Sequence, residues 1–436
     1  IPFVTHLKEE ETKTKRFKNM GVGLQFKYNM TAIETGIDLR KDESFYENAS
    51  WQTVSNDTIG FMNYRSESRS GWKQDVIFKK RVKAFNEDRT THDYSLAKVL
   101  IGYDQHHKPI RWEFQAKTEE SYSEERAIVY DSVGAGLGQY RYDLIFNTYI
   151  SDPNGAFIAY TVPTGKRDPN TVIEGSQKFT IDLGRISGYP DILIRGNNRL
   201  DYRGSGIDIR KLIQPEITDS LSTRSRLVSR LEMIYSGKRR FRGWIENQQA
   251  LNGLDPRGND LDHSNETGLE IDQAISRSIT IKNRGQFRTK SVKSTVSTLR
   301  NRDVKGWWNE AQLQVKLNES MDFDLGIMGG FDSGSQQGDS FSAQAYGVLL
   351  NGRFFFKKTG RLHTRVSWAK ALEKNNSEYL PPEALNGYPI GTSFRSNTRL
   401  QYFLNRSVSM IFTLNTIDDD RYDNFITFQG EIRAHF

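Results

Sequence analysis

Two acidic stretches hold the residues best suited by type to bind a metal ion. The stretches "DPRGNDLDH" and "TIDDDRYDN" supply the carboxylates of Asp255, Asp260 and Asp262, and of Asp418, Asp419 and Asp420. Carboxylate oxygens are the ligands that Ca²⁺ prefers, but neither stretch has the spacing of an EF-hand loop. Carboxylates in polar loops usually stay hydrated. The sequence therefore marks both stretches only as calcium candidates and predicts no cofactor.

Other patterns that resemble reactive sites do not meet the requirements of the chemistry. The glycines of Gly134–Gly138 lack the Lys-Ser/Thr of a P-loop, and Gln139 stands where a dinucleotide fingerprint needs glycine. We interpret them as a turn. His106 and His107 are adjacent, and neighbours on a strand point to opposite faces, so they are poorly placed to share a metal. The chain has no cysteine and no nucleophile elbow. The sequence predicts no enzyme activity.

Charged residues are numerous and scattered along the chain. Lys and Arg number 61 against 54 Asp and Glu, without a basic block, so we expect no nucleic-acid partner. A subset alternates with apolar residues and is predicted to line an aqueous face. This subset is Lys73, Asp75, Lys79, Arg81, Arg111, Glu113, Arg361 and Arg365. A cationic excess on such a face favours anionic solutes or lipopolysaccharide phosphates. The alternative is that these charges only solvate a polar wall.

The elements that position these charges are β-strands, because apolar residues recur at every second position. In residues 72–83, most apolar side chains occupy even positions and most charged ones occupy odd positions. The clearest strands are 22–28, 72–83, 110–117, 307–317, 323–331, 346–356, 362–368, 400–404, 408–414 and 426–436. Less regular patterns lie at 33–39, 59–64, 96–103, 179–183, 192–200, 227–235, 241–245 and 269–281. The sequence predicts about sixteen strands (range 12–18) of roughly ten residues, the length that a tilted strand needs to cross a bilayer.

The rest of the chain is predicted as turns, with two exceptions. Residues 119–175 follow no regular period and are expected to form a long loop or a small insertion. The stretch "DIRKLIQPEI" predicts a short helix that Pro215 ends. No change in composition marks a boundary, so residues 1–436 are predicted to be one domain.

Alternation occurs both in soluble β-sandwiches and in membrane barrels. Long strands, a charged second face and aromatic residues near strand ends favour an antiparallel up-and-down transmembrane β-barrel. The last stretch, "NFITFQGEIRAHF", also ends within a strand, and the first and last strands of a sheet in lipid must pair. Two alternatives remain open. One is a soluble or surface-attached all-β binding module. The other is a C-terminal fragment of a larger barrel, because the start, "IPFVTHLKEEE", lacks Met and an apolar signal segment.

The C-terminal region carries a resemblance to a known class of protein. A Pro-rich turn ends in "GYPIGTS", three alternating stretches follow, and the chain finishes with "EIRAHF". This arrangement resembles the end of large outer-membrane β-barrel proteins of the Bacteroidetes and Chlorobi type, and more distantly the barrel of the type 9 secretion and gliding-motility system. The stretch "VGAGLGQYRYDLIFNTYISDPNGAFI" is similar to an insertion in the same proteins. Ile432, Ala434 and Phe436 match the apolar, Phe-terminated strand that serves such barrels as an assembly signal.

The resemblance implies a location and a set of partners. The expected location is the bacterial outer membrane, with a role as a pore, a transport component or a membrane anchor of a surface assembly. The expected partners are outer-membrane lipid and lipopolysaccharide, the barrel-assembly machinery during insertion, and other outer-membrane or periplasmic proteins of a complex.

Overall fold

The computed structural model describes residues 2–434, apart from 5–7, 12–14, 47–49, 86–90, 135–137, 144–147, 187, 205–221, 238, 337, 357–358, 376–379, 406 and 421. The chain divides into two compact units, which are described separately. Unit 1 comprises residues 1–180, 197–228 and 250–260, and unit 2 comprises residues 181–196, 229–249 and 261–436. Whether residues 1–436 are one domain stays a prediction.

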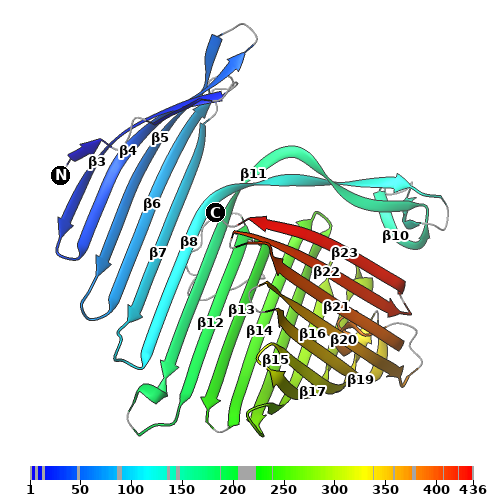
Figure 1. The fold of residues 1–436 in the computed structure, drawn as a ribbon. Helices are drawn as coiled ribbons and strands as arrows, with labels where there is room; N and C mark the ends of the chain where they lie inside the picture. Colours follow the sequence, from blue (N-terminus) through cyan, green and yellow to red (C-terminus); the bar gives the residue numbers. More distant parts are fainter. Residues whose placement is uncertain are drawn as a thin grey trace. The chain divides into compact units, whose positions relative to one another are not determined.

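Unit 1 is built mainly from antiparallel strands that pair in chain order (Figure 1). These strands are β3 (Lys15–Tyr28), β4 (Thr31–Tyr46), β5 (Ser50–Glu67), β6 (Trp72–Phe85), β7 (Thr91–Asp104) and β8 (Ile110–Ser132). Two short strands, β1 (Pro2–Val4) and β2 (Lys8–Glu11), both pair with β3. The turn from β3 to β4 needs a left-handed residue, and Asn29 adopts φ 51° there.

Residues 119–175 are mostly strand, which corrects the loop interpretation of this region. The region includes the end of β8, then β9 (Gly138–Asp143) and β10 (Thr148–Gly155), and most of β11 (Phe157–Asp182). β9 pairs with β10 and, at Tyr140 and Phe157, with β11. The region is therefore a folded insertion of paired strands. Polar residues interrupt the alternation here, which is why the sequence pattern missed these strands.

Unit 2 contains the C-terminal strands, which pair antiparallel in chain order. These are β16 (Ile279–Ser294), β17 (Arg302–Asn318), β18 (Met321–Gln336), β19 (Asp339–Phe356), β20 (Gly360–Glu373), β21 (Gly391–Phe403), β22 (Val408–Asp419) and β23 (Tyr422–Ala434). Before them in the chain come β12 (Ile192–Gly204), β13 (Ser222–Ser236), β14 (Arg239–Asp255) and β15 (Gly258–Ala274), and a boundary between the two units falls within each of these four strands. Short 3-10 turns lie at η1 (Leu183–Arg185), η3 (Thr298–Arg300) and η4 (Ala384–Gly387).

The all-β, antiparallel up-and-down prediction is confirmed, but the strand count is too low. The described residues form 23 strands rather than about sixteen. The strands β1 and β2 have too few residues to show a period, and β9 and β10 lie within residues 119–175, which were predicted as a loop or small insertion. The single stretch predicted at 269–281 covers the end of β15, a turn and the start of β16. The helix predicted in "DIRKLIQPEI" falls largely among residues 205–221, outside the described residues. None of the helices in the described part of the chain is long and apolar enough to cross a membrane.

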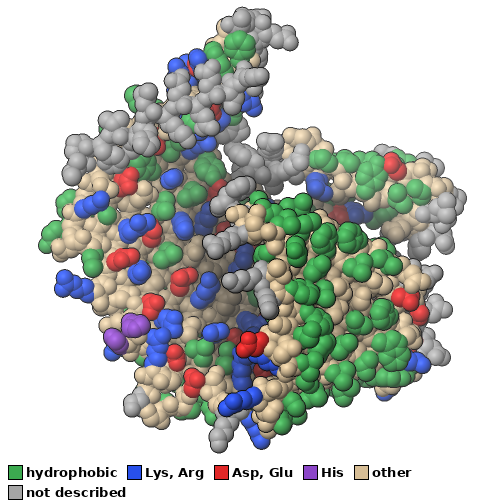
Figure 2. Space-filling model, in the orientation of Figure 1, with side chains coloured by type: hydrophobic (Ala, Val, Ile, Leu, Met, Phe, Trp, Pro, Cys, Tyr) green, Lys and Arg blue, Asp and Glu red, His purple; other side chains and the backbone are tan. Residues whose placement is uncertain are grey.

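Each unit has one apolar and one polar face, as the alternation predicts. In unit 1, Val22, Leu24 and Phe26 of β3 lie on the apolar face and are 60–64% exposed. In unit 2, Ile327 and Phe428 lie on the apolar face and are 66% and 69% exposed. Figure 2 shows this face over β20–β23 as a nearly continuous apolar surface, and it shows Lys, Arg, Asp and Glu side chains interspersed over β6–β8. The large side chains that a soluble sheet would bury are thus exposed.

Candidate functional site

A loop packs onto the polar face of unit 2, at residues 380–390 between β20 and β21. We call it the β20–β21 loop. Ala384 and Leu385 of η4 are 1% and 0% exposed, and Tyr388 is 8% exposed. They belong to two apolar clusters that include strand residues of the polar face. Leu385 and Tyr388 cluster with Trp308, Met328, Ala343, Ala345, Leu349, Ala369 and Ala371. Ala384 clusters with Val304 and Phe341.

Small side chains on β19 and β20 make room for this loop. Ala345 lies opposite Ala371, and Gly347 lies opposite Ala369, in the register of the two strands. All four positions belong to the polar face, where most other positions carry charged or amide groups. Because alanine and glycine leave a shallow depression, the loop backbone can approach the sheet closely. Burying Leu385 there contributes about 1.5–3 kcal/mol of transfer free energy.

Buried hydrogen bonds hold the loop in a strained conformation. Leu385 and Asn386 adopt left-handed φ values of 48° and 55°, which cost on the order of 1–3 kcal/mol each. The Leu385 N–H donates to Oδ2 of Asp332 at 2.5 Å, and Asp332 is only 1% exposed. Arg288 Nη2 donates to the same oxygen at 2.6 Å, and Arg288 also bonds Asn386. One buried carboxylate thus links the loop to β16 and β18.

A two-point ion pair fixes the start of the loop. Arg302 Nε and Nη2 lie 2.9 and 2.8 Å from the two Glu383 oxygens, and Lys290 Nζ lies 3.7 Å away. Burial raises the pKa of Glu383, but the Arg302 hydrogen bonds and the charges of Arg302 and Lys290 outweigh it, so the net pKa is lowered. Glu383 is therefore held as a carboxylate.

Tyr388 fixes the end of the loop between an aromatic ring and a cation. Its ring is nearly parallel to that of Trp308, with centroids 6.0 Å apart. Arg395 lies on β21, and its guanidinium carbon is 4.1 Å from the centroid of the Tyr388 ring. Arg395 also donates a hydrogen bond to the Gly387 carbonyl. The Tyr388 hydroxyl donates to Ser367 Oγ at 3.1 Å. Both ends of the loop are therefore docked.

A cavity of about 490 Å³ lies beside the docked loop, on the polar face of β20–β23. Arg365, Asn397, Asn415 and Thr427 line one part of it, and Tyr388 lines another. Asn397 Nδ2 donates to Asn415 Oδ1, and Asn415 Nδ2 donates to Thr427 Oγ1 at 3.2 Å. These hydrogen bonds arrange a row of amide and hydroxyl groups along the wall of the cavity.

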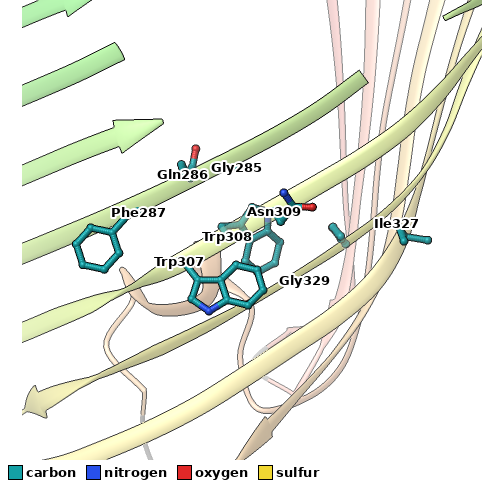
Figure 3. Close-up of a pocket in the computed structure, with 9 residues that line it drawn as sticks. Gly285, Gln286, Phe287, Trp307, Trp308, Asn309, Ile327 and Gly329 are labelled. Atoms are coloured by element: carbon teal, nitrogen blue, oxygen red, sulfur yellow. The ribbon is translucent and has the colours of Figure 1, made fainter. Parts of the chain in front are cut away.

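The apolar face has a hollow of its own, of about 510 Å³, at β16–β18 (Figure 3). Gly285, Asn309 and Gly329 leave space there beside the side chains of Phe287 and Trp307. Asn309 exchanges hydrogen bonds with Asn283 at 3.2 and 3.3 Å, which satisfies two amide groups on an apolar surface.

The eight predicted aqueous-face charges all lie on polar faces, while their function stays a prediction. Lys73, Asp75, Lys79 and Arg81 share one face of β6, and Arg111 and Glu113 share the matching face of β8. Several have partners from neighbouring strands. Arg81 pairs with Asp57, Asp75 lies 3.3 Å from Arg65, Lys73 lies 3.8 Å from Glu67, Glu113 lies 4.0 Å from Lys178, and Arg361 donates to Gln401 at 2.9 Å. Arg365, on β20, lines the cavity beside the loop.

Three of the six calcium candidates lie beside basic side chains. Asp255 receives hydrogen bonds from Arg257 at 2.6 and 2.9 Å, and Asp262 lies 3.2 Å from Lys290. Asp419 is buried 3.7 Å from Arg395. Asp418 lies opposite Phe394, and Asp260 lies in β15. No group of three or more His, Asp or Glu side chains in the described part of the chain is placed to hold a metal ion.

The remaining predicted features are placed as follows. Ile432 is 71% exposed on the apolar face of β23, and Ala434 is the last residue of that strand. Phe436 lies outside the described residues. Gly134 has φ 103°, and a Cβ on Gly138 would lie 2.4 Å from the Phe157 backbone, so Gly138 serves the close approach of β9 and β11. The part of the glycine motif between them, residues 135–137, is outside the described residues.

Sequence reasoning missed the β20–β21 loop as a site and treated it as a polar turn. Two features of the sequence indicate the docked loop, and the sequence analysis did not relate them to each other. The loop sequence "LPPEALNGYPIG" contains Leu385 and Tyr388, and the polar-face positions of β19 and β20 contain alanine where charged residues were expected.

Comparisons with known proteins identify solved structures but no family. No family model matches the chain, and no curated protein matches it. Among solved structures, the outer membrane transporter YddB from Escherichia coli has a TM-score of 0.36 at 7% identity, covering 97% of this chain and 76% of that one. The copper transporter OprC has a TM-score of 0.41 at 8% identity, and the match covers 97% of this chain and 72% of that one. The siderophore receptor PirA from Acinetobacter baumannii has a TM-score of 0.39 at 7% identity, and the match covers 97% of this chain and 71% of that one. Scores and identities this low establish no relationship with these proteins.

Proposed function

We propose that this chain forms the β-barrel wall of an integral outer-membrane protein that acts as a transport component. In this proposal the apolar faces contact lipid and the polar faces line an aqueous route. The β20–β21 loop occupies part of that route, which favours a selective passage over an open pore. Outer-membrane lipid, lipopolysaccharide and the barrel-assembly machinery are the partners that the proposal requires.

The observation that carries the proposal is the sidedness of the sheets. Ile327, Phe428 and Ile432 are 66%, 69% and 71% exposed, on strands whose other face carries charges and amides. Exposed apolar surface costs roughly 25 cal/mol per Å² in water, and hydrocarbon removes that cost. A soluble β-sandwich would instead bury this face against a second layer. The exposed face therefore favours the membrane wall over the soluble binding module.

Paired lysine substitutions on the two faces test this function. Ile327 lies on the apolar face of β18, and Gln312 lies on the polar face of β17, in register with the neighbouring residue Gly326. A lysine facing hydrocarbon at mid-bilayer costs about 2–4 kcal/mol, whereas one facing water costs little. We expect the wild type and Gln312→Lys to float with liposomes and to show heat-modifiable gel migration. Ile327→Lys should lose most of both properties.

Two results would contradict the membrane wall. One is a wild-type chain that stays soluble without detergent and does not float. The other is equal insertion of the two lysine variants, since this would mean that the apolar face does not contact lipid.

A further inference from the structure

The cavity beside the β20–β21 loop has the features of a ligand site rather than of a packing defect. Its volume of about 490 Å³ lies within the usual range of small-molecule sites, roughly 300–1,000 Å³. Its lining combines guanidinium, amide and hydroxyl groups with an aromatic edge from Tyr388. The docked loop forms part of its wall, so the cavity exists only while the loop is in place.

Two arginines leave donors for an anion in this cavity. Within the described part of the chain, Arg365 has no carboxylate partner and lies opposite Asn351 and Asn397 in the strand register. Arg395 holds Tyr388 and Gly387, and its buried Nε–H has no acceptor among the described residues. An unsatisfied buried donor costs free energy that a bound carboxylate would recover.

Two acidic groups lie near the cavity, and each has a hydrogen-bond or ion-pair partner within the protein. Glu310 also lines the cavity, but its oxygens accept from Trp308 Nε1 at 3.1 Å and from Gln312 Nε2 at 3.3 Å. Asp419 is buried 3.7 Å from Arg395 and offsets part of that charge. The Arg365 guanidinium has no carboxylate partner among the described residues, while Glu310 keeps its own negative charge in the lining.

The row of side chains beside Arg365 suits a ligand with several hydroxyl groups. The hydrogen bonds from Asn397 to Asn415 and from Asn415 to Thr427 use only part of the capacity of each side chain. An amide offers two donors and an acceptor with two lone pairs, so the row keeps donors and acceptors for sugar hydroxyls.

We propose that this cavity binds a sugar acid, a small hydroxylated carboxylate of one or two sugar units. Arg365 and Arg395 bind the carboxylate, and Asn397, Asn415 and Thr427 bind the hydroxyls. This inference rests on the proposed function, because a solute reaches the cavity only if the polar face is open to water. It names the substrate class of the route.

Calorimetric titration of the full chain in detergent tests the site, with sodium D-glucuronate as the probe and D-glucose as the neutral match. We expect glucuronate to bind at least about tenfold more tightly than glucose, because a charge-assisted hydrogen bond is stronger than a neutral one. Arg365→Gln should remove most of this preference. Arg361→Gln is the matched control, since Arg361 is on the same face of β20, bonds Gln401 and does not line the cavity. It should bind glucuronate within about twofold of the wild type.

A second variant keeps the test decisive if Arg365→Gln does not fold. Asn415→Ala removes the middle of the amide row and should weaken glucuronate binding by roughly fivefold to tenfold. Equal affinity for glucuronate and glucose, unchanged binding by either variant, or no binding by the folded wild type overturns the proposal. Liposome flotation separates the two hypotheses. Protein that floats but does not bind contradicts the site alone, and protein that binds but does not float contradicts the membrane function alone.

Discussion

Arg302 at the start of β17 and Glu383 at the start of η4 form a two-point ion pair, with nitrogen–oxygen distances of 2.9 and 2.8 Å. The partners are 81 residues apart in the chain. The pair joins the β20–β21 loop to a strand three positions earlier in the sheet. Its planar, bidentate geometry is one that arginine makes and lysine does not.

Breaking this pair should free the loop without unfolding the strands. In Arg302→Gln, Glu383 loses its bidentate partner, which costs on the order of 1–3 kcal/mol of loop docking. We expect faster amide hydrogen exchange in residues 380–390 and unchanged exchange in β17–β20. Arg361→Gln, on the same sheet but away from the loop, is the control. Unchanged exchange at Leu385 in Arg302→Gln would show that the apolar contacts alone hold the loop.

Acid should release the loop through Glu383. The pKa of Glu383 is lowered from its ordinary value of 4.5 by Arg302 and Lys290, despite the opposing effect of burial. A lowered folded-state pKa contributes stability above the unfolded value, and that stability is lost as pH falls through the folded value. The protection of the loop amides, taken relative to the intrinsic exchange rate at each pH, should therefore be constant from neutral pH to about 5 and fall below about 4. Glu383→Gln should show the same lowered protection at every pH, and a wild-type-like pH profile of protection in this variant would assign the effect to another group.

Filling the depression under the loop should displace it. Ala369 on β20 is 1% exposed beneath the loop. In Ala369→Phe the new ring takes the space of the loop side chains, and overpacking costs typically about 1–3 kcal/mol. We expect protease to cut within residues 380–390 at a lower concentration than in the wild type. Lys370→Phe places the same ring on the apolar face of the same strand and should leave the loop protected. Equal protection of both variants would contradict the packing described.

The sheet was more predictable than the site because the two depend on different kinds of information. Faces follow from the parity of sequence position, so Ile432 and Phe428 could be placed on the apolar face directly. Parity also caused one error. Apolar residues keep to odd-numbered positions through the turn between Ala274 and Ile279. The sequence pattern therefore predicted the end of β15 and the start of β16 as one strand.

The loop could not be predicted in the same way. Its burial depends on Asp332, Arg302 and Ser367, which come from three different strands. No local period links such residues, and only the register of the sheet brings them together. Ala345 and Ala369 indicate where the loop docks only once it is known that they share a face with charged neighbours.

The docked loop contacts successive strands from β16 to β21. Arg288, Arg302, Asp332, Ala345, Ser367 and Arg395 each come from a different strand of this series and each contacts the loop or its apolar cluster. All six strands must be paired in register before these contacts can form together. Hydrogen-exchange protection across the whole loop therefore reports assembly, because the full set of contacts forms only when these six strands are paired.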